Sequence, residues 1–379
     1  MVLFLHHRYR TTGGEERVVD DLRRLVRERL GEEAQLLTRA SVGLGPGRAA
    51  AGLLGGGLEP AAVAAAVRRT GARVVHAHNL LPTLGWRALA AARGEGARIV
   101  LHLHNFRLVC AVGTCFTEGA DCTRCHGRDT RPGVRHACRG SRAEGLAYAA
   151  GLALWQRRRV AQADAVIVPS QAAMDRLRAL GAPLEATRPG ALRGPSVHVL
   201  AHVVHPVSSV AAPGRGEHAL VSSRLAPEKG VDVAIDAAAR AGLPLVIAGD
   251  GPEEAALRAR AAATGASVRF AGRVGAEELA DLRARAALAV VPSRSAETFG
   301  LAAAEAMAAG LPVVASAIGA LTDLLAGEDL VAPGDPAALA HAMIARWGDE
   351  HAGQAGRARI HALAAPERIA PRLAAIYAG

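Results

Sequence analysis

Two basic side chains lie five residues apart in the segment Ser223–Gly230, directly after an apolar run that ends at Ser222. Arg224 provides a planar guanidinium and Lys229 a compact ammonium, and together two such groups can bind one diphosphate. Lys229 is the single lysine among the 45 Lys and Arg residues of the chain. All other basic positions are arginine, so the lysine at position 229 departs from the composition of the chain. We therefore predict that Arg224 and Lys229 bind an anionic ligand and are not merely solvated surface charges.

Two carboxylates follow a second apolar run, Leu288–Pro292. Glu297 lies in the next loop, and Glu305 lies inside the helix that this loop is predicted to open. Carboxylate oxygens accept hydrogen bonds, so each residue can bind the vicinal hydroxyls of a sugar ring. The backbone N–H groups at the start of the helix, which suit a diphosphate, belong to Phe299, Gly300 and Leu301.

The first half of the chain has two weaker candidates, each at the end of an apolar run. Gly13 and Gly14 begin a helical pattern, and paired glycines let the backbone approach a phosphate closely. A plain turn is the alternative for this pair. His104 ends the run that begins at Ile99, where a histidine is either catalytic or structural.

Strand-length apolar runs alternate with helical patterns along the whole chain, which predicts parallel sheets of the α/β class. The segment Pro206–Gly216 breaks this alternation and is the predicted linker. We therefore expect two Rossmann-like, doubly wound domains facing each other across a cleft. They span residues 1–205 and 206–365, and the helix 366–379 is expected to pack back on the first domain. Ligands in such sheets bind at the carboxyl ends of strands.

These segments together resemble the retaining glycosyltransferases of the GT-B fold, in glycosyltransferase family 4 (glycosyl transferases group 1). The resemblance extends over nearly the whole chain and rests on "LHLHNFRLVC", "SRLAPEKG", "LVIAGDGPE" and "VPSRSAETFGLAAAEAMAAGLPVVAS". The last motif is the most specific of the four. A hexosyltransferase that uses a nucleotide-diphosphate sugar is the activity that the resemblance implies.

The resemblance also implies a role for each candidate in the second half. Arg224 and Lys229 would hold the donor diphosphate and stabilise the departing nucleoside diphosphate. Glu305 would bind the nucleotide ribose, and Glu297 the hydroxyls of the transferred sugar. Backbone contacts with the sugar and phosphates would come from Phe299, Gly300 and Leu301.

In the first half, the resemblance implies that the loop at Gly13 and Gly14 closes on the diphosphate, with His104 beside the donor sugar. Three positions depart from the family pattern. Ser223 replaces the usual Gly, Asn105 stands where an Asp often follows the His, and residues 319–323 replace the commoner Gly-Gly-x-x-Glu. None of these changes removes a charge from the predicted diphosphate site, so activity is expected.

The expected mechanism is metal-independent and needs no cofactor besides the donor substrate. Metal-using transferases commonly present Asp-x-Asp, and no two aspartates of this chain are spaced i, i+2. Fixed cations and dipoles would stabilise the charge of the leaving diphosphate. Retention of configuration follows from the resemblance alone, with the leaving phosphate assisting the acceptor hydroxyl on the same face.

All five cysteines lie between residues 110 and 138. They are Cys110, Cys115, Cys122, Cys125 and Cys138. Such clustering favours thiolates or a metal over disulfides in a cytosolic chain. One interpretation is a structural Zn²⁺ site made by Cys122 and Cys125 with Cys115 and Cys138; the other is a set of reduced, packed thiols. Related transferases carry similar cysteine runs, which implies a role in shaping the acceptor side.

The charge of the chain is unevenly distributed. The overall net charge is +10, but residues 1–205 carry 29 Arg against 16 acidic residues, whereas residues 206–379 are slightly acidic. A basic first domain suits an anionic acceptor, such as a lipid diphosphate, or an anionic membrane face. The apolar stretch 146–155 followed by Arg157, Arg158 and Arg159 is either an interfacial helix or an ordinary core helix.

Composition limits the remaining possibilities. No apolar run approaches the ~20 residues that cross a bilayer, and the first ten residues do not resemble a secretory signal. We expect a cytoplasmic protein, either free or peripheral on the inner face of the plasma membrane. The net positive charge suggests an alternative from a different class, a basic nucleic-acid-binding protein. Aromatic residues make up 3% of the chain, which leaves few stacking platforms for bases and disfavours this alternative. The expected role is cell-envelope or exopolysaccharide assembly. Glycosylation of a small natural product and a nucleotide-sugar epimerase of the same fold are the alternatives, and the donor base, sugar and acceptor stay open.

Overall fold

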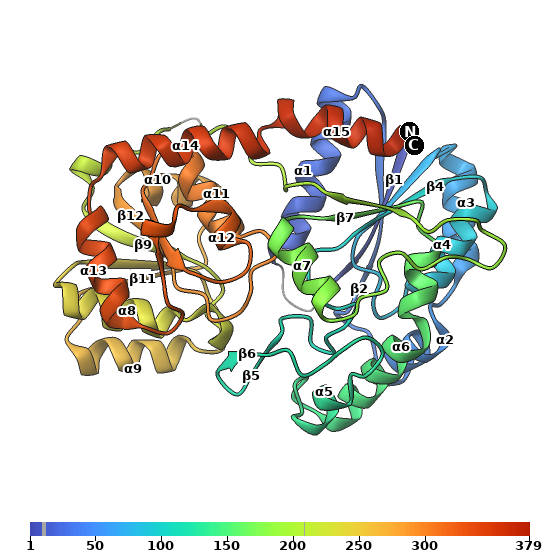
Figure 1. The fold of residues 1–379 in the computed structure, drawn as a ribbon, viewed down its shortest axis with the longest axis horizontal. Coiled ribbons are helices and arrows are strands. Elements are labelled where there is room, and N and C mark those ends of the chain that lie inside the picture. The colour runs from blue at the N-terminus through green and yellow to red at the C-terminus, as the bar shows by residue number, and fades with distance from the viewer. Residues whose placement is uncertain (10–12, 208) are drawn as a thin grey trace. The chain divides into compact units, whose positions relative to one another are not determined.

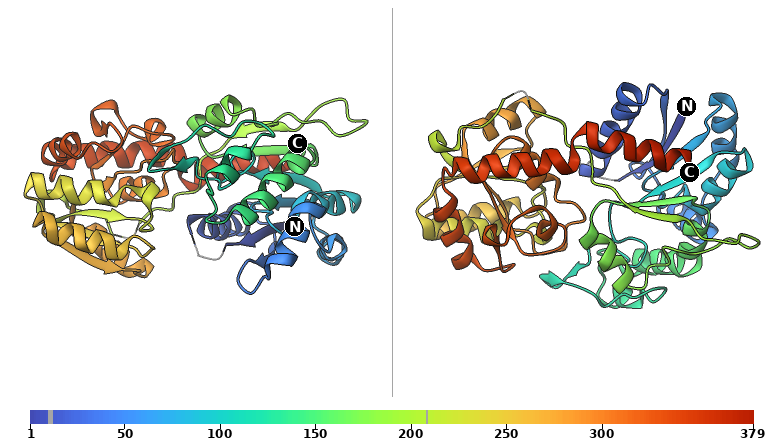
Figure 2. Two further views of the ribbon diagram at one scale, coloured as in Figure 1. Left: turned by 90° about the horizontal axis from the view of Figure 1, so that it is seen from below. Right: turned by 45° about the horizontal axis from the view of Figure 1, so that its top comes forward.

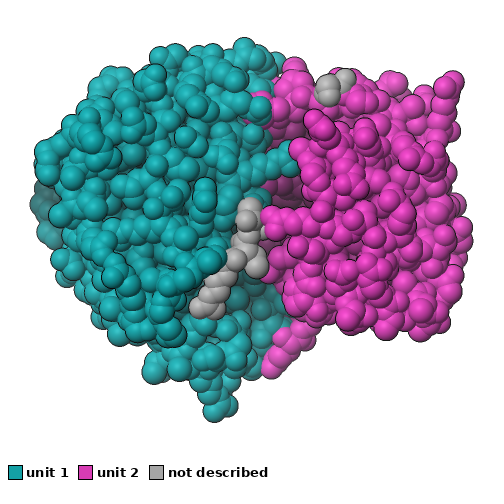
Figure 3. All heavy atoms as spheres, turned by 180° about the vertical axis from the view of Figure 1, so that it is seen from behind, with its two compact units in different colours: residues 1–117, 122–203, 366–379 teal, residues 118–121, 204–365 magenta. Residues whose placement is uncertain are grey.

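The computed structural model describes residues 1–9, 13–207 and 209–379. The chain forms two compact units, which Figure 3 shows in different colours. Unit 1 comprises residues 1–117, 122–203 and 366–379, and unit 2 comprises residues 118–121 and 204–365. The linker predicted at residues 206–216 lies just after the junction at residues 203 and 204. Each unit contains a six-stranded parallel sheet, so the predicted α/β class with two doubly wound domains is confirmed.

The sheet of unit 1 has the strand order β2-β1-β3-β4-β7-β8. Its strands are β1 (Val2–Arg8), β2 (Ala34–Ala40), β3 (Val74–Ala77), β4 (Arg98–His102), β7 (Ala165–Val168) and β8 (Ser196–Val199). The order reverses at β1, which lies between β2 and β3. In this register Phe4 pairs with His76, and His76 pairs with Val100. Neighbouring strands therefore bring residues far apart in the sequence onto one face.

Helices flank this sheet (Figure 1). They are α1 (Gly14–Arg29), α2 (Pro46–Gly55), α3 (Pro60–Thr70), α4 (Gly85–Gly94), α5 (Arg131–Arg135), α6 (Arg142–Ala161), α7 (Gln171–Ala179) and α15 (Pro366–Ala378). The short strands β5 (Phe116–Thr117) and β6 (Ala120–Asp121) lie in the cysteine-containing insertion. The C-terminal helix α15 packs against α1 and β4, and the Tyr377 hydroxyl lies 2.7 Å from Nδ1 of His76. This contact joins the end of the chain to the sheet of unit 1.

The sheet of unit 2 has the strand order β11-β10-β9-β12-β13-β14. Its strands are β9 (His218–Ser222), β10 (Leu245–Ala248), β11 (Val268–Gly272), β12 (Ala286–Val291), β13 (Val313–Ser316) and β14 (Leu330–Val331). The order reverses between β9 and β12. In doubly wound sheets the ligand crevice lies at such a reversal, outside the carboxyl ends of the two strands.

Helices cover both faces of the unit 2 sheet (Figures 1 and 2). They are α8 (Val231–Ala241), α9 (Glu254–Thr264), α10 (Ala276–Ala284), α11 (Leu301–Ala308), α12 (Leu321–Leu324), α13 (Pro336–Arg346) and α14 (Glu350–Ala364). One continuous apolar core joins the strands with α8, α9 and α13, and includes the fully buried Ile235, Ile247 and Met343. This core fixes the strand ends from which the site loops start.

No single helix among the described residues is both long and apolar enough to cross a bilayer. The pair α2 and α3 meets the length and composition criterion together, but its two helices are bent by 75° relative to each other.

Candidate functional site

The loops that follow β9 and β12 meet at the strand-order reversal of unit 2. Lys229 from the first loop donates a hydrogen bond to Oε1 of Glu297 in the second loop, at 2.6 Å. The hydroxyl of Ser293 donates to the same oxygen at 2.8 Å. The structure thus brings together two residues that the sequence predicted separately.

The Lys229–Glu297 pair is partly buried, with 27% and 18% of the side chains exposed. Burial raises the pKa of Glu297, but the ammonium of Lys229 and the two hydrogen bonds outweigh this effect and lower the pKa overall. Glu297 is therefore a carboxylate at neutral pH. Its charge balances that of Lys229, so the pair positions an ammonium without leaving it alone in a partly desolvated site.

Arg224 lies in the same loop as Lys229 and pairs with the carboxylate of Glu228, which is buried. The backbone carbonyl of Glu228 also accepts hydrogen bonds from the N–H groups of Arg294 and Ser295, at 2.9 and 3.3 Å. Glu228 thereby ties the β9 loop to the β12 loop. The role of Glu228 could not be predicted from the sequence, because it depends on the adjacency of β9 and β12.

Two glycines pack closely against the backbone of the loop that carries Arg224. Gly249 and Gly251 have φ angles of +152° and +157°, and they lie in the loop after β10. A Cβ on Gly249 would lie 1.8 Å from the carbonyl oxygen of Ser223, and one on Gly251 2.3 Å from that of Leu225. The N–H of Leu225 donates a hydrogen bond to the carbonyl of Asp250, which lies between the two glycines, at 2.7 Å. Only glycine permits this close approach, which fixes the backbone on both sides of Arg224.

The helix α11 begins where the sequence analysis placed it. Gly300 is its N-cap with φ +82°, and Leu301 is its first residue. Phe299, just before the cap, is buried. The backbone N–H groups assigned to the sugar and phosphates therefore lie at a helix N-terminus, which attracts anions.

Glu305 pairs with Arg283 of α10, and both side chains are largely buried. An unpaired carboxylate would be costly at this largely buried position, and Arg283 provides the opposite charge. Any hydroxyl that binds to Glu305 must therefore share the carboxylate with Arg283.

In unit 1, His104 follows the carboxyl end of β4. Its Nε2 lies 2.7 Å from Nδ1 of His78, and its ring stacks on those of His102 and His202, with centroids 4.3 and 5.1 Å away. Burial lowers the pKa of His104 well below its ordinary value, and the neighbouring His202 and His6 lower it further. The imidazole is therefore neutral at neutral pH. It can accept or donate one proton, but it supplies no positive charge.

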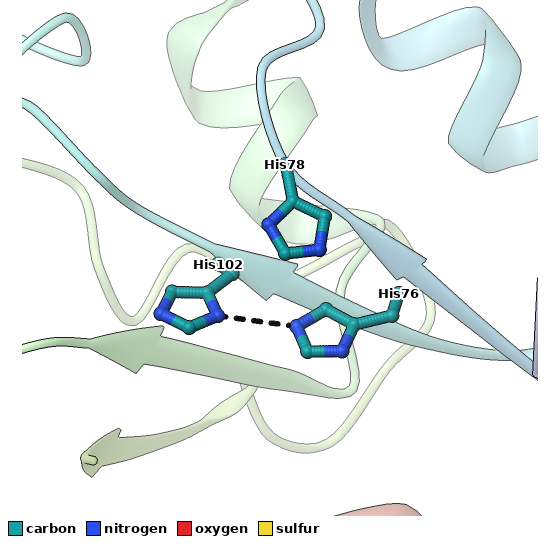
Figure 4. Close-up of side chains that lie close together, drawn as sticks. All are labelled: His76, His78 and His102. Carbon is teal, nitrogen blue, oxygen red and sulfur yellow. Dashed lines mark hydrogen bonds between the residues drawn. The ribbon is translucent and has the colours of Figure 1, made fainter. Parts of the chain in front are cut away.

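Two groups of three histidines have the spacing of metal ligands. His76, His78 and His102 form one group (Figure 4), and His102, His104 and His202 form the other; in each, one atom per residue lies within 4.8 Å of the others. Nε2 of His76 lies 3.2 Å from Nδ1 of His102. That separation fits a hydrogen bond between neutral imidazoles, as Figure 4 shows, and it also fits two ligands of one ion.

The two glycines at the start of α1 lie beside acidic side chains. The N–H of Gly13 donates to Oε2 of Glu16 at 2.8 Å, and Gly14 is the first residue of the helix. The preceding residues Thr11 and Thr12 lie outside the described residues. The Gly13 amide is therefore already bonded to the protein in this arrangement.

The five cysteines are all free thiols and line one pocket together with His136. Cys110 accepts hydrogen bonds from the Cys115 thiol and from backbone N–H groups, which lower its pKa to about 6. Among the described residues, the groups that bring three ligand atoms within 4.8 Å consist of histidines alone. The predicted Zn²⁺ knuckle of Cys115, Cys122, Cys125 and Cys138 is therefore not supported, because these sulfurs are not gathered around one point.

The Trp and Arg side chains near the end of α6 are engaged within unit 1. The indole N–H of Trp155 donates to the carbonyl of Leu54 at 2.9 Å. The guanidinium of Arg158 lies over the rings of Trp155 and Trp86, 5.0 and 5.4 Å from their centroids. Of the arginine run, Arg159 is buried rather than solvated.

Comparison with known proteins assigns each half of the chain to a described domain type. Residues 2–191, about half of the chain, match the model described as glycosyl transferase 4-like domain. Residues 208–355 match the model described as glycosyl transferases group 1.

Curated relatives match over a shorter region. The chain is 42% identical over 127 residues to a GDP-mannose-dependent alpha-(1-6)-phosphatidylinositol dimannoside mannosyltransferase of Mycobacterium tuberculosis, which is 32% of each chain. It is 39% identical over 133 residues to the D-rhamnosyltransferase WbpZ of Pseudomonas aeruginosa, 34% of each chain. The matched region thus spans about a third of the length of these relatives.

Solved structures match over the whole chain. The sucrose-phosphate synthase of Thermosynechococcus elongatus has a TM-score of 0.70 at 20% identity and covers 100% of this chain and 98% of its own. Anabaena Alr3699/HepE in complex with UDP and glucose has a TM-score of 0.64 at 19% identity, covering 100% and 99%. At this level of identity the likeness shows a shared fold.

Proposed function

Because the chain belongs to the group 1 glycosyltransferases of the GT-B fold, we propose that it transfers a sugar from a nucleotide-diphosphate sugar to a hydroxyl acceptor. The observation that carries this proposal is the Lys229–Glu297 contact at the carboxyl ends of β9 and β12. It places an ammonium, a carboxylate and the N-terminus of α11 at the strand-order reversal. These are the groups that a sugar linked to a diphosphate requires.

In the proposed reaction the bond between the sugar C1 and the diphosphate oxygen breaks, and the electron pair stays on the diphosphate. Lys229, Arg224 and the N–H groups of Phe299, Gly300 and Leu301 stabilise the resulting charge. The acceptor hydroxyl attacks C1 from the same face, and its proton passes to the leaving phosphate oxygen. The transfer is thereby retaining and needs no carboxylate nucleophile.

Glu297 has two roles in this proposal. Before the donor binds, it holds Lys229 at 2.6 Å and keeps the ammonium in the loop. When the donor is bound, its carboxylate accepts hydrogen bonds from the sugar hydroxyls, and the ammonium turns to the diphosphate. Glu305 would bind the ribose hydroxyls while remaining paired with Arg283.

We propose a metal-independent reaction because the sequence has no Asp-x-Asp pair and the diphosphate loop already offers two cations. His104 is proposed to lie beside the donor sugar as a neutral imidazole whose orientation is fixed by His78. Gly13 and Gly14 would approach the diphosphate only after the Gly13 amide leaves Glu16.

The proposed role is cell-envelope or exopolysaccharide assembly. Relatives named as a phosphatidylinositol dimannoside mannosyltransferase and a D-rhamnosyltransferase support this proposal. Glycosylation of a small natural product and nucleotide-sugar epimerisation are the other outcomes that a product analysis would separate. An epimerase would release an isomerised sugar without extending an acceptor. Nucleic acid is not a proposed partner.

We propose a cytoplasmic protein that is peripheral on an anionic membrane face. The net positive charge of the first half supports this proposal. Two exposed leucines on α6, Leu146 and Leu154, supply apolar side chains beside the arginines of that helix. Trp155 and Arg158 contribute less to the proposed membrane binding than their residue types suggested, because both side chains contact the protein itself.

A donor panel tests the proposed function. UDP-, GDP-, dTDP- and ADP-sugars are added separately, and the melting temperature and slow donor hydrolysis are recorded. We expect one nucleotide to raise the melting temperature of the wild type and of Arg285→Ala, an exposed arginine outside the site. Lys229→Ala should lose that increase. Equal increases in all three proteins would contradict the assignment of the donor site.

A further inference from the structure

A polar pocket opens in unit 1 beyond the carboxyl ends of β3 and β4. It has a volume of about 360 Å³ including its open mouth. Its polar lining includes Glu15, His78, Asn79, His104, Arg107 and Arg159. Residues 78–81 of its lining directly follow β3, and residues 103–105 directly follow β4. The pocket therefore lies outside the carboxyl ends of parallel strands, where open α/β sheets bind their ligands.

Arg159 is the unusual residue of this pocket. It lies in the last turn of α6, and only 6% of the residue is exposed. Its Nε is buried without a hydrogen-bond partner, and no ion pair joins Arg159 to any other residue that the structure describes. A buried guanidinium without a counter-charge is costly, because its charge has lost most of its contact with water and its buried Nε–H has no acceptor.

The other charged groups of the pocket do not neutralise Arg159. Burial and the positive charge of Arg107 lower the pKa of Arg159 to about 10, so it remains a cation at neutral pH. Glu15 is the acidic residue of the lining, and its Oε2 accepts a hydrogen bond from the Tyr9 hydroxyl at 2.8 Å. Burial raises the pKa of Glu15. Two cations thus face at most one anion.

Arg107 is held in a fixed position. Its guanidinium lies 4.7 Å from the centre of the Tyr9 ring and donates to the carbonyl of Val112 at 3.3 Å. The side chain of Asn105 accepts a hydrogen bond from the backbone N–H of Arg107 at 2.9 Å. Nε of Arg107 is buried without a hydrogen-bond partner. The Nε–H of Arg107 is therefore positioned to donate to a further acceptor, such as a ligand oxygen.

We propose that this pocket binds a phosphate or diphosphate group of the acceptor, with Arg159 as the main counter-charge and Arg107 beside it. The assignment to the acceptor rests on the proposed glycosyl transfer, whereas the anion site itself does not. A phosphate fits better than a single carboxylate, because it carries up to two charges and offers several oxygens to two guanidiniums. His78 and His104 are neutral and share one hydrogen bond, so one of the two imidazoles keeps an N–H that can donate to the same oxygens without adding charge.

Calorimetric titration with inorganic phosphate and with glycerol 3-phosphate tests the site. All proteins carry Lys229→Ala, so that the predicted donor site does not contribute. Arg159→Gln removes the buried charge, and Arg157→Gln is the matched control, because Arg157 is exposed on the same helix. We expect Arg159→Gln to weaken binding by about tenfold or more and Arg157→Gln to leave it unchanged. Equal affinities in these two variants would overturn the proposal. The proposal would also fail if neither phosphate nor glycerol 3-phosphate bound to the Lys229→Ala protein.

The melting temperature separates loss of the site from loss of the fold. In phosphate-free buffer Arg159→Gln should melt no lower than Arg157→Gln, because it removes an uncompensated buried charge. Added phosphate should stabilise Arg157→Gln and not Arg159→Gln. If Arg159→Gln melts much lower without phosphate, the guanidinium is structural and the proposal fails.

Two further arms separate the sources of the phosphate and the two proposals. Phosphatidylcholine vesicles containing phosphatidic acid replace glycerol 3-phosphate in a co-sedimentation assay. If binding to the vesicles falls equally in Arg157→Gln and Arg159→Gln, the lipid phosphate binds to surface arginines and not to the pocket, and the proposal is rejected. If no nucleotide sugar binds to the wild type while phosphate binding still requires Arg159, glycosyl transfer fails and the anion site stands.

Discussion

Lys229 and Glu297 are 68 residues apart in the chain, yet their side chains meet at 2.6 Å. The contact depends on β9 and β12 being neighbours in the sheet, although β10 and β11 lie between them in the sequence. Because the ammonium is balanced before any ligand arrives, the donor must compete with Glu297 for it. Replacing either residue therefore leaves the charge of the other without its balancing partner and removes the hydrogen bond that orients its side chain.

Lys229→Ala should lower kcat/KM by about a thousandfold, because it removes the ammonium opposite the leaving diphosphate. Lys229→Arg should recover little of the loss, since a planar guanidinium cannot take the place of the ammonium beside Glu297 and Ser293. Steady-state kinetics with the donor found by the panel measures both variants. Turnover close to that of the wild type in Lys229→Ala would disprove the role of this residue.

Unit 1 should lose stability in mild acid through its buried histidines. Burial lowers the pKa of His76 and of His202 to about 3, whereas the ordinary value is 6.5. Below pH 6.5 the unfolded chain binds protons that the folded chain does not, so stability falls progressively between pH 6.5 and about 3.

Calorimetry at pH 7.5 and pH 5 measures this effect. The melting temperature of unit 1 should be lower at pH 5, and His202→Phe should reduce the difference, because phenylalanine keeps the stacked ring but does not titrate. An unchanged difference in His202→Phe would show that other groups cause the acid sensitivity.

Arg283→Leu should destabilise unit 2 by about 3 kcal/mol, because it leaves the carboxylate of Glu305 largely buried and unbalanced. The double variant Arg283→Leu/Glu305→Leu should recover most of this loss. Urea denaturation of the two single variants and the double variant completes the cycle. A double variant as unstable as the sum of the single variants would mean that the pair is not coupled.

Treatment with a chelator should leave the transfer rate unchanged, since the proposed reaction uses Arg224, Lys229 and a helix N-terminus in place of a metal ion. The rate is measured before and after exhaustive dialysis against EDTA, and again after Mg²⁺ or Mn²⁺ is restored. A rate that falls on dialysis and returns with either ion would contradict metal independence.

The fold could be predicted because it follows from short-range patterns. Apolar runs such as Val74–Ala77 and Leu245–Ala248 are bounded by turn residues and become central strands, as their composition indicates. Candidate residues at strand ends were likewise visible, because parallel sheets collect ligands there. Arg224, Lys229 and Glu297 all follow such ends.

The partners of these residues could not be predicted, because they depend on which strands are adjacent. Glu228 and Arg283 became apparent only when their neighbours across the sheet were known. The histidine groups are a second example. His76 and His102 each have period-two partners in the sequence, but only the register of β3 and β4 stacks the two rings. Arg159 was seen as part of a charged run, and its burial is a tertiary effect.

The lysine that stands alone in the sequence also gives the protein a chemical label in a known place. Since Lys229 is the single side-chain amine, an amine-selective reagent such as an N-hydroxysuccinimide ester marks one side chain of unit 2, and reductive methylation with ¹³C-formaldehyde places one NMR reporter beside Glu297. The chemical shift of that reporter can follow the ammonium as it moves from carboxylate to diphosphate. Occupancy of the donor site thus becomes directly readable in a protein that needs no engineering.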